Sequence, residues 1–209
     1  NLVAVESFGL AETGHHIIAM ELLGGESLLG VLNRLQRIPW QRAINITAAL
    51  LDALGHAHSR QVIHRDIKPE NIQLMGDPGA DERVKLMDFG VAYVAADRAF
   101  SEPAPGSHRV SGTPAYMSPE QIRGVPLDGR SDLYSLGVLL YEMLSGRRPF
   151  DGDDPIEVCR AQLFTKVEPL ASVLPEGHDV PGDLVQLVGE LMAKSRKSRI
   201  SSVGALLAR

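Results

Sequence analysis

Four polar side chains in two short segments of the sequence could carry out chemistry together. Asp66, Lys68 and Asn71 lie within one stretch of eight residues, and Asp88 follows in a second segment. A loop carboxylate such as that of Asp66 can accept the proton of an incoming hydroxyl group. The ammonium group of Lys68 is a mobile point charge that can reach a phosphate. Asn71 and Asp88 offer oxygen ligands of the kind that Mg²⁺ prefers.

Taken singly, these carboxylates would be ordinary surface turn residues, and only their combination points to a reaction. One interpretation that the residues leave open is a metal-dependent hydrolase that uses Asp66 and Asp88. Release of phosphate without formation of a phosphorylated protein would favour that hydrolase.

The elements that must position these side chains can be predicted from the hydrophobic spacing. Residues 132–144 are apolar nearly all round, so we expect a helix buried on every side. Residues 91–117 hold three prolines and show no sustained period, which predicts a long functional or disordered loop. The remaining expected elements are two strands within 1–23, helices at 28–35, 40–58, 155–164, 183–193 and from about 201, and a hairpin of 72–74 with 84–86.

Two of these helices carry more specific expectations. Ser27 is a suitable N-cap for the helix at 28–35. The residues at helical spacing in 40–58 are Ile44, Thr47, Leu51, Leu54 and His58.

Composition narrows the class of protein. The 209 residues carry a net charge of −5 with scattered basic residues, which argues against nucleic acid as a partner. The single Cys159 excludes an internal disulfide and a cysteine-based metal site, so a reducing cytoplasmic setting is expected. No apolar run approaches the roughly 20 residues of a membrane span. The chain begins with Asn1 and shows no signal pattern, so we expect it to be an excerpt of a longer protein.

Four motifs in the expected order resemble the eukaryotic-type (Hanks-type) serine/threonine protein kinases, in the style of the bacterial branch. The motifs are His64-Arg65-Asp66-Ile67-Lys68-Pro69-Glu70-Asn71, Asp88-Phe89-Gly90, Gly112-Thr113-Pro114-Ala115-Tyr116-Met117 and Ser118-Pro119-Glu120. The resemblance covers residues 1–209. It implies an α+β protein-kinase-like fold with a mainly helical C-lobe at 24–209. Residues 1–23 would be a two-strand remnant of the N-lobe.

The resemblance also implies ATP and Mg²⁺ (or Mn²⁺) as cofactors and protein serines or threonines as substrates. Asp66 and Lys68 would be the catalytic pair, with Met20 as gatekeeper beside the adenine. The residues that it implies for binding nucleotide and metal are Glu21, Leu23, Leu74, Asn71 and Asp88, with Asn71 and Asp88 as the metal ligands.

Further roles follow from the same resemblance. Structural roles are implied for His64, Phe89, Glu120, Asp132 and Arg199, with a buried ion pair between Glu120 and Arg199. Thr113 would belong to the substrate shelf and bond the catalytic loop. Arg65 would bind a phosphate on the activation loop, with Ser107 as the preferred phosphosite and Ser111 as the second choice.

The family's glycine-rich loop and phosphate-clamping lysine have no counterpart, because all five lysines follow the connector at 20–25. We therefore expect the 209 residues alone to be inactive and the parent protein to be active. The alternative is a kinase-like binding module without catalytic activity. A second kinase domain is a potential partner, and the parent could be anchored to a membrane through other segments.

Overall fold

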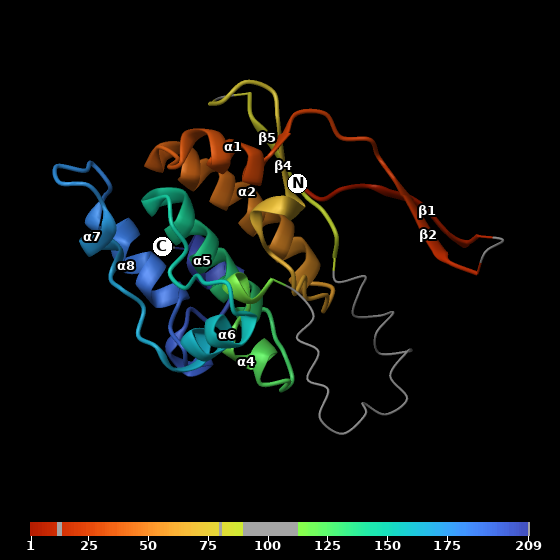
Figure 1. Cartoon of the computed structure of the whole chain (residues 1–209). Coiled ribbons are helices and arrows are strands. Elements are labelled where there is room, and N and C mark those ends of the chain that lie inside the picture. Colours follow the sequence, from red (N-terminus) through yellow and green to blue (C-terminus); the bar gives the residue numbers. More distant parts are fainter. Residues whose placement is uncertain (12–13, 80, 90–112, 209) are drawn as a thin grey trace.

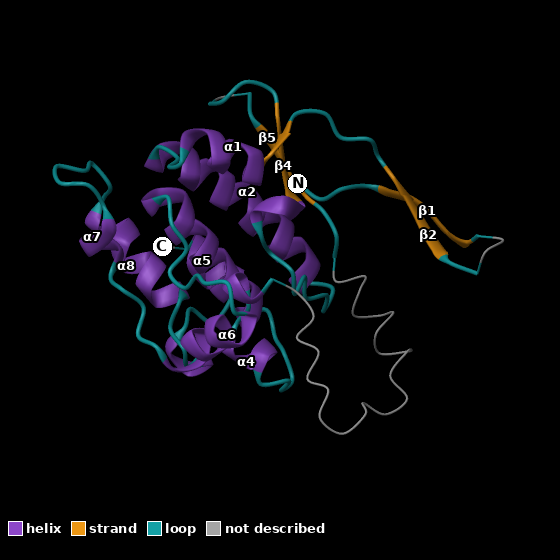
Figure 2. Cartoon of the chain, in the orientation of Figure 1, coloured by secondary structure: helices purple, strands orange, loops and turns teal. Residues whose placement is uncertain are grey.

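The protein is a mainly helical body joined to two small antiparallel sheets (Figures 1 and 2). The computed structural model describes residues 1–11, 14–79, 81–89 and 113–208. The helices of this part are α1 (Leu28–Leu35), α2 (Trp40–His58), α4 (Pro119–Ile122), α5 (Arg130–Ser145), α6 (Pro155–Phe164), α7 (Leu170–Val173), α8 (Gly182–Leu191) and α9 (Val203–Leu207). Short 3₁₀ helices span Pro69–Asn71, Pro114–Tyr116 and Arg196–Ser198. The predicted α+β class is confirmed.

The two sheets differ in how they join the helical body. Strands β1 (Val5–Leu10) and β2 (His16–Met20) form a hairpin that projects away from the helices (Figure 1), and all of β1 is exposed. Strands β3 (Glu26–Ser27), β4 (Ile72–Met75) and β5 (Arg83–Leu86) form the second sheet in that order, beside α1 and α2. The strands predicted within residues 1–23 and the predicted hairpin of 72–74 with 84–86 are both present. The division of the chain after residue 23 stays a prediction.

The core is organised around α5. Thirteen of its residues are buried, as the all-round apolar pattern predicted, and the helix packs against α2 and α8. Gly137 lets α8 approach closely, because a Cβ at this position would lie 2.7 Å from the Cβ of Leu191. The first turn of α5 holds Ser131 and Asp132, which are buried polar residues and need partners.

The buried stripe of α2 agrees with the prediction at Thr47, Leu51 and Leu54, which are buried, and differs at the start of the helix. Ile44 is exposed, whereas Ala43, Ile46 and Leu50 are buried in the core. The apolar positions of this helix include several alanines, so the spacing of its large side chains alone placed Ile44 in the stripe incorrectly. The expected cap of α1 is present, since the Ser27 hydroxyl accepts a hydrogen bond from the Gly30 amide at 3.1 Å.

A buried ion pair ties the C-terminal region to α4. The Arg199 guanidinium donates to both carboxylate oxygens of Glu120, at 2.6 and 2.8 Å, and the Ser131 hydroxyl donates to the same carboxylate. Burial disfavours the charged form of Glu120, but the hydrogen bonds and charge of Arg199 outweigh it and lower the pKa of this carboxyl. The pair expected between these two residues is therefore formed.

This pair should be important for stability. Glu120→Gln leaves the buried Arg199 cation uncompensated, and we expect the free energy of unfolding to fall by about 3–5 kcal/mol in urea denaturation. The control is Glu157→Gln, which breaks an exposed pair with Arg160 on α6 and should change this free energy by less than about 0.5 kcal/mol. Equal losses in the two variants would contradict the assignment.

Candidate active site

The loop that carries Asp66 is hydrogen-bonded to the first turn of α5. The Asp132 carboxylate accepts hydrogen bonds from the His64 amide and the Arg65 amide, both at 2.9 Å. A ring nitrogen of His58, at the end of α2, lies 2.7 Å from the same carboxylate. Asp132 is 1% exposed, so these partners replace the water that the carboxylate loses on folding.

Two residues of the candidate site have left-handed backbone conformations. Arg65 has φ of 71° and Asp88 has φ of 57°. Such values are uncommon outside glycine and persist only where the surrounding contacts enforce them. The residue before Asp66 and the second candidate metal ligand are therefore both under local strain.

The Asp66 carboxylate is held by two neighbours from its own loop. Lys68 Nζ lies 2.8 Å from Asp66 Oδ2, and the Asn71 side-chain amide donates to the same oxygen at 3.0 Å and to the Asp66 carbonyl at 2.8 Å. Asp66 is only partly buried, so its carboxylate can meet a group that arrives from solvent. This geometry brings together three of the four residues that the sequence singled out.

Asp88 reaches the same region through the pairing of β4 with β5. Ile72 pairs with Leu86, and beyond that pair the Met87 amide donates to the Asn71 carbonyl at 2.9 Å. Asp88 follows directly and is exposed. The side-chain nitrogen of Asn71 donates to Asp66. The side-chain oxygen of Asn71 is therefore the atom that could bind a cation.

These two oxygen donors suit Mg²⁺, which commonly takes one or two protein ligands together with water and phosphate oxygens. Within the described residues, no group of three histidine, cysteine or acidic side chains is placed to hold a metal on its own. The donor set therefore fits a metal that arrives with a phosphate ligand.

The buried ring of His64 contacts both the loop that carries Asp66 and the segment before Asp88. Its Nε2 lies 2.9 Å from the Met87 carbonyl, and its Nδ1 accepts a hydrogen bond from the Asp66 amide at 3.3 Å. Its ring packs against Phe89 with a centroid distance of 4.5 Å. These contacts require the neutral ring with its proton on Nε2. Burial lowers the pKa of His64, against the opposing effect of the Asp132 charge.

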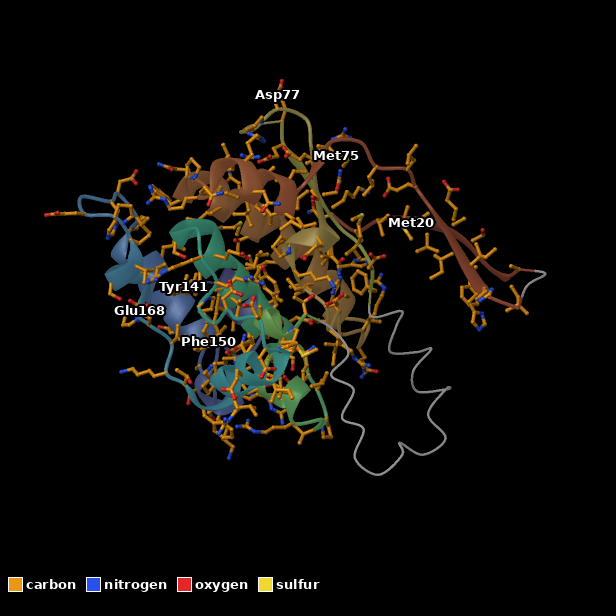
Figure 3. All side chains as sticks on the ribbon, in the orientation of Figure 1. Met20, Met75, Asp77, Tyr141, Phe150 and Glu168 are labelled. Carbon is orange, nitrogen blue, oxygen red and sulfur yellow. The ribbon has the colours of Figure 1, made fainter. Side chains whose placement is uncertain are left out.

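The connector that was expected to meet adenine passes over β4. Met20 is the last residue of β2, on the chain between the hairpin and the helical body (Figure 3). The Glu21 carboxylate accepts from Lys85 Nζ at 2.6 Å and from the Ala4 amide at 2.7 Å, and these bonds lower its pKa. These contacts fix the residue that follows the end of β2, where the connector begins.

Gly25 brings the connector against the second sheet. Its φ is 84°, and a Cβ here would collide with the Leu74 carbonyl. Leu74 itself is buried beneath this crossing. The roles of Glu21, Leu23 and Leu74 toward a nucleotide stay predictions.

Two hydrogen bonds near the site were not anticipated from the sequence. Gln121 Nε2 donates to the Arg65 carbonyl at 2.6 Å, and the Tyr116 hydroxyl donates to Glu142 at 2.5 Å. Ser118 and Gln121 match the pattern of a helix capping box, a local signal that was available in the sequence. That pattern does not reveal the contact with Arg65.

Three residues predicted for the substrate shelf and activation loop have different outcomes. Thr113 is described, and among the described residues its hydroxyl has no hydrogen bond to the catalytic loop. Ser107 and Ser111 lie outside the described residues.

Comparison with known proteins agrees with this geometry. The family described as protein kinase domain matches residues 1–208. The chain is 36% identical over 208 residues to serine/threonine-protein kinase pkn3 of Myxococcus xanthus, covering 100% of the chain and 38% of that protein. It is 39% identical over 212 residues to serine/threonine-protein kinase PknB of Mycobacterium leprae, covering 100% of the chain and 32% of that protein.

A cyanobacterial relative, serine/threonine-protein kinase A of Synechocystis, is 35% identical over 217 residues, covering 99% of the chain and 40% of that protein. The chain thus spans between 32% and 40% of the length of these relatives. Within the described residues, no helix has the length and apolar character needed to cross a bilayer.

The neutral state of His64 predicts a pH dependence of stability. Below its ordinary pKa of 6.5 the unfolded chain binds a proton at His64, which the folded protein resists because its pKa is lowered. Stability is therefore lost as the pH falls. Between about pH 7.5 and about pH 5.5 this group should remove up to about 1.4 kcal/mol from the free energy of unfolding.

His64→Gln should reduce that dependence, measured by urea denaturation at both pH values. Exposed His56 is the control, and His56→Gln should leave the dependence unchanged. The interpretation is wrong if wild type and His64→Gln differ by the same free energy at both pH values.

Proposed function

We propose that the parent protein of this chain, which belongs to the protein kinase family, transfers the γ-phosphate of ATP to serine and threonine hydroxyl groups of proteins. The observation that carries the proposal is the position of the Asp66 carboxylate, which Lys68 and Asn71 hold at the exposed edge of a loop anchored in the core. Phosphoryl transfer needs mainly positioning and charge stabilisation, which such a site provides.

In the proposed reaction, Asp66 orients the acceptor hydroxyl and takes its proton as the oxygen forms a bond to the γ-phosphorus. The bond from that phosphorus to the leaving oxygen of ADP breaks in the same displacement. Lys68, 2.8 Å from Asp66, can bind an oxygen of the transferred group. Asn71 and Asp88 would hold Mg²⁺, which neutralises charge on the phosphates when bound. Their side chains thereby orient the phosphate chain toward Asp66.

The connector would bind the base. Glu21 and Leu23 offer backbone groups to adenine, with Leu74 beneath it. The fixed path of the connector supports this, because Gly24 accepts a hydrogen bond from Gln73 at 3.0 Å and Gly25 crosses directly over Leu74. An ordered connector places its backbone groups in advance, which reduces the entropy cost of binding.

The experiment that tests the function uses the complete gene product, Mg·ATP and a general protein substrate, with analysis of the phosphoamino acids formed. Asp66→Asn should lower kcat on the order of 10²–10⁴-fold with a much smaller change in nucleotide affinity. Asp88→Ala should weaken binding of the metal–nucleotide complex as well. Asp77→Asn, in the exposed turn between β4 and β5 (Figure 3), is the matched control and should change neither.

Two results would contradict the proposal. Mainly phosphotyrosine in the product would exclude serine and threonine as the acceptors. Equal effects of the Asp66 and Asp88 variants on nucleotide binding would contradict their separate roles.

We also propose that phosphorylation regulates the activity, because of the position of Arg65 beside Asp66. Arg65 directly precedes Asp66, and its guanidinium could bind a phosphate on Ser107 as a bidentate pair, with Ser111 as the second choice. We expect phosphopeptide mapping of the active protein to find Ser107. The activity losses of Ser107→Ala and Arg65→Ala should overlap in the double variant. Losses that multiply would show that the two residues act independently.

A further inference from the structure

Gln121 uses both polar atoms of its side chain in opposite directions. Its Oε1 accepts from the Ser118 amide at 2.9 Å, which completes the capping box at the start of α4. Its Nε2 donates at 2.6 Å to the carbonyl of Arg65, which is 56 residues away in the sequence. The first contact shapes a local turn, whereas the second joins α4 to the catalytic loop.

The second contact acts on the peptide group that aims Asp66. The carbonyl of Arg65 and the amide of Asp66 belong to one planar unit, so fixing both ends fixes its orientation. Gln121 holds the carbonyl end, and Nδ1 of His64 holds the amide end at 3.3 Å. Asp132 holds the Arg65 amide just before it.

This orientation requires external support. Arg65 has φ of 71°, a conformation that is unfavourable for a residue with a side chain and persists only when its surroundings enforce it. The hydrogen bond from Gln121 supports this conformation on the carbonyl side of the residue. Without it, the peptide could rotate toward a relaxed conformation and carry the Asp66 carboxylate with it.

The helix that presents Gln121 is itself fixed. The preceding residue, Glu120, forms the buried pair with Arg199, and the Ser118 hydroxyl accepts from the Gln121 amide at 3.3 Å. The short segment 113–117, where the substrate shelf is expected, leads directly into α4. A displacement of that segment would therefore move Gln121 relative to Arg65.

We propose that Gln121 is a positioning residue for Asp66, and that it couples the segment 113–122 to the catalytic loop through the Arg65 carbonyl. The inference rests on the proposed phosphoryl transfer for its catalytic consequence. Its structural content, a clamp on the Arg65–Asp66 peptide, can be measured separately.

The test is Gln121→Glu, which keeps an oxygen for the Ser118 amide and replaces the donor to Arg65 by a carboxylate oxygen that repels the carbonyl. In the complete gene product we expect kcat to fall on the order of 10- to 100-fold, the size of effect that a small misplacement of a catalytic group produces. The KM for ATP should stay within about threefold, because α4 has no role in nucleotide binding here. Hydrogen exchange of peptides spanning residues 62–68 should become faster.

Two controls separate this effect from general instability. Gln186→Glu makes the same substitution on α8, where Gln186 Nε2 donates to Glu190 at 2.8 Å, and it should change neither kcat nor exchange in 62–68. Ser202→Ala removes the cap hydroxyl of α9, which accepts from the Ala205 amide at 3.1 Å, so it should lower the melting temperature without speeding exchange in residues 62–68. Gln121→Asn, one methylene shorter, replaces Gln121→Glu if that variant does not fold.

The outcomes are distinguishable. If wild type transfers no phosphate, the proposed function fails, and exchange in residues 62–68 still decides the role of Gln121. Unchanged exchange in Gln121→Glu overturns the clamp. A fall in kcat that matches the loss of folded protein overturns the positioning role, and a fall beyond it with faster exchange supports it.

Discussion

The candidate site depends on one buried carboxylate. Asp132 lies in the first turn of α5, where the free amide groups and dipole of a helix N-terminus favour a negative charge. It accepts bonds from the two amides that precede Asp66 and contacts the ring of His58. Desolvating a carboxylate costs several kcal/mol unless it is paired, so the loop and this charge stabilise each other. The catalytic loop thereby shares the rigidity of the most buried helix in the described part of the chain.

Contacts with the rigid core maintain the strained backbone conformations near the site. Arg65 and Asp88 have left-handed backbones on either side of the site, and each is flanked by residues that are firmly held. His64 connects them, because it accepts from the Asp66 amide and contacts the carbonyl of Met87. Its neutral state is required for the bond from the Asp66 amide, because a protonated Nδ1 could not accept it. One buried imidazole therefore joins the loop that carries Asp66 to the segment that leads into Asp88.

Much of this arrangement could be predicted, and the failures have physical causes. The all-round apolar pattern predicted α5, since a helix without a polar face must be buried. In α2 only Ile44 was misplaced, because the neighbouring Ala43 is buried and a small alanine does not stand out in the spacing. The motifs identified Asp66, Asn71 and Asp88 by type and order. Only the fold could show that the β4–β5 pairing brings Asn71 beside Met87.

Gln121 shows most clearly why part of the site could not be predicted. Its spacing from Ser118 predicts a capping box, and that local role accounts fully for a glutamine at this position. The bond to Arg65 depends on a loop 56 residues earlier, so no local pattern reports it.

Adjacent residues of α4 consequently have separate duties. Glu120 ties the helix to Arg199 and contributes to stability, whereas Gln121 faces the catalytic loop and contributes to geometry. A helix of a single turn can serve both because its neighbouring side chains point in different directions. The pair of Glu120 with Arg199 fixes the position of α4. The hydrogen bond from Gln121 to the Arg65 carbonyl can therefore orient Asp66.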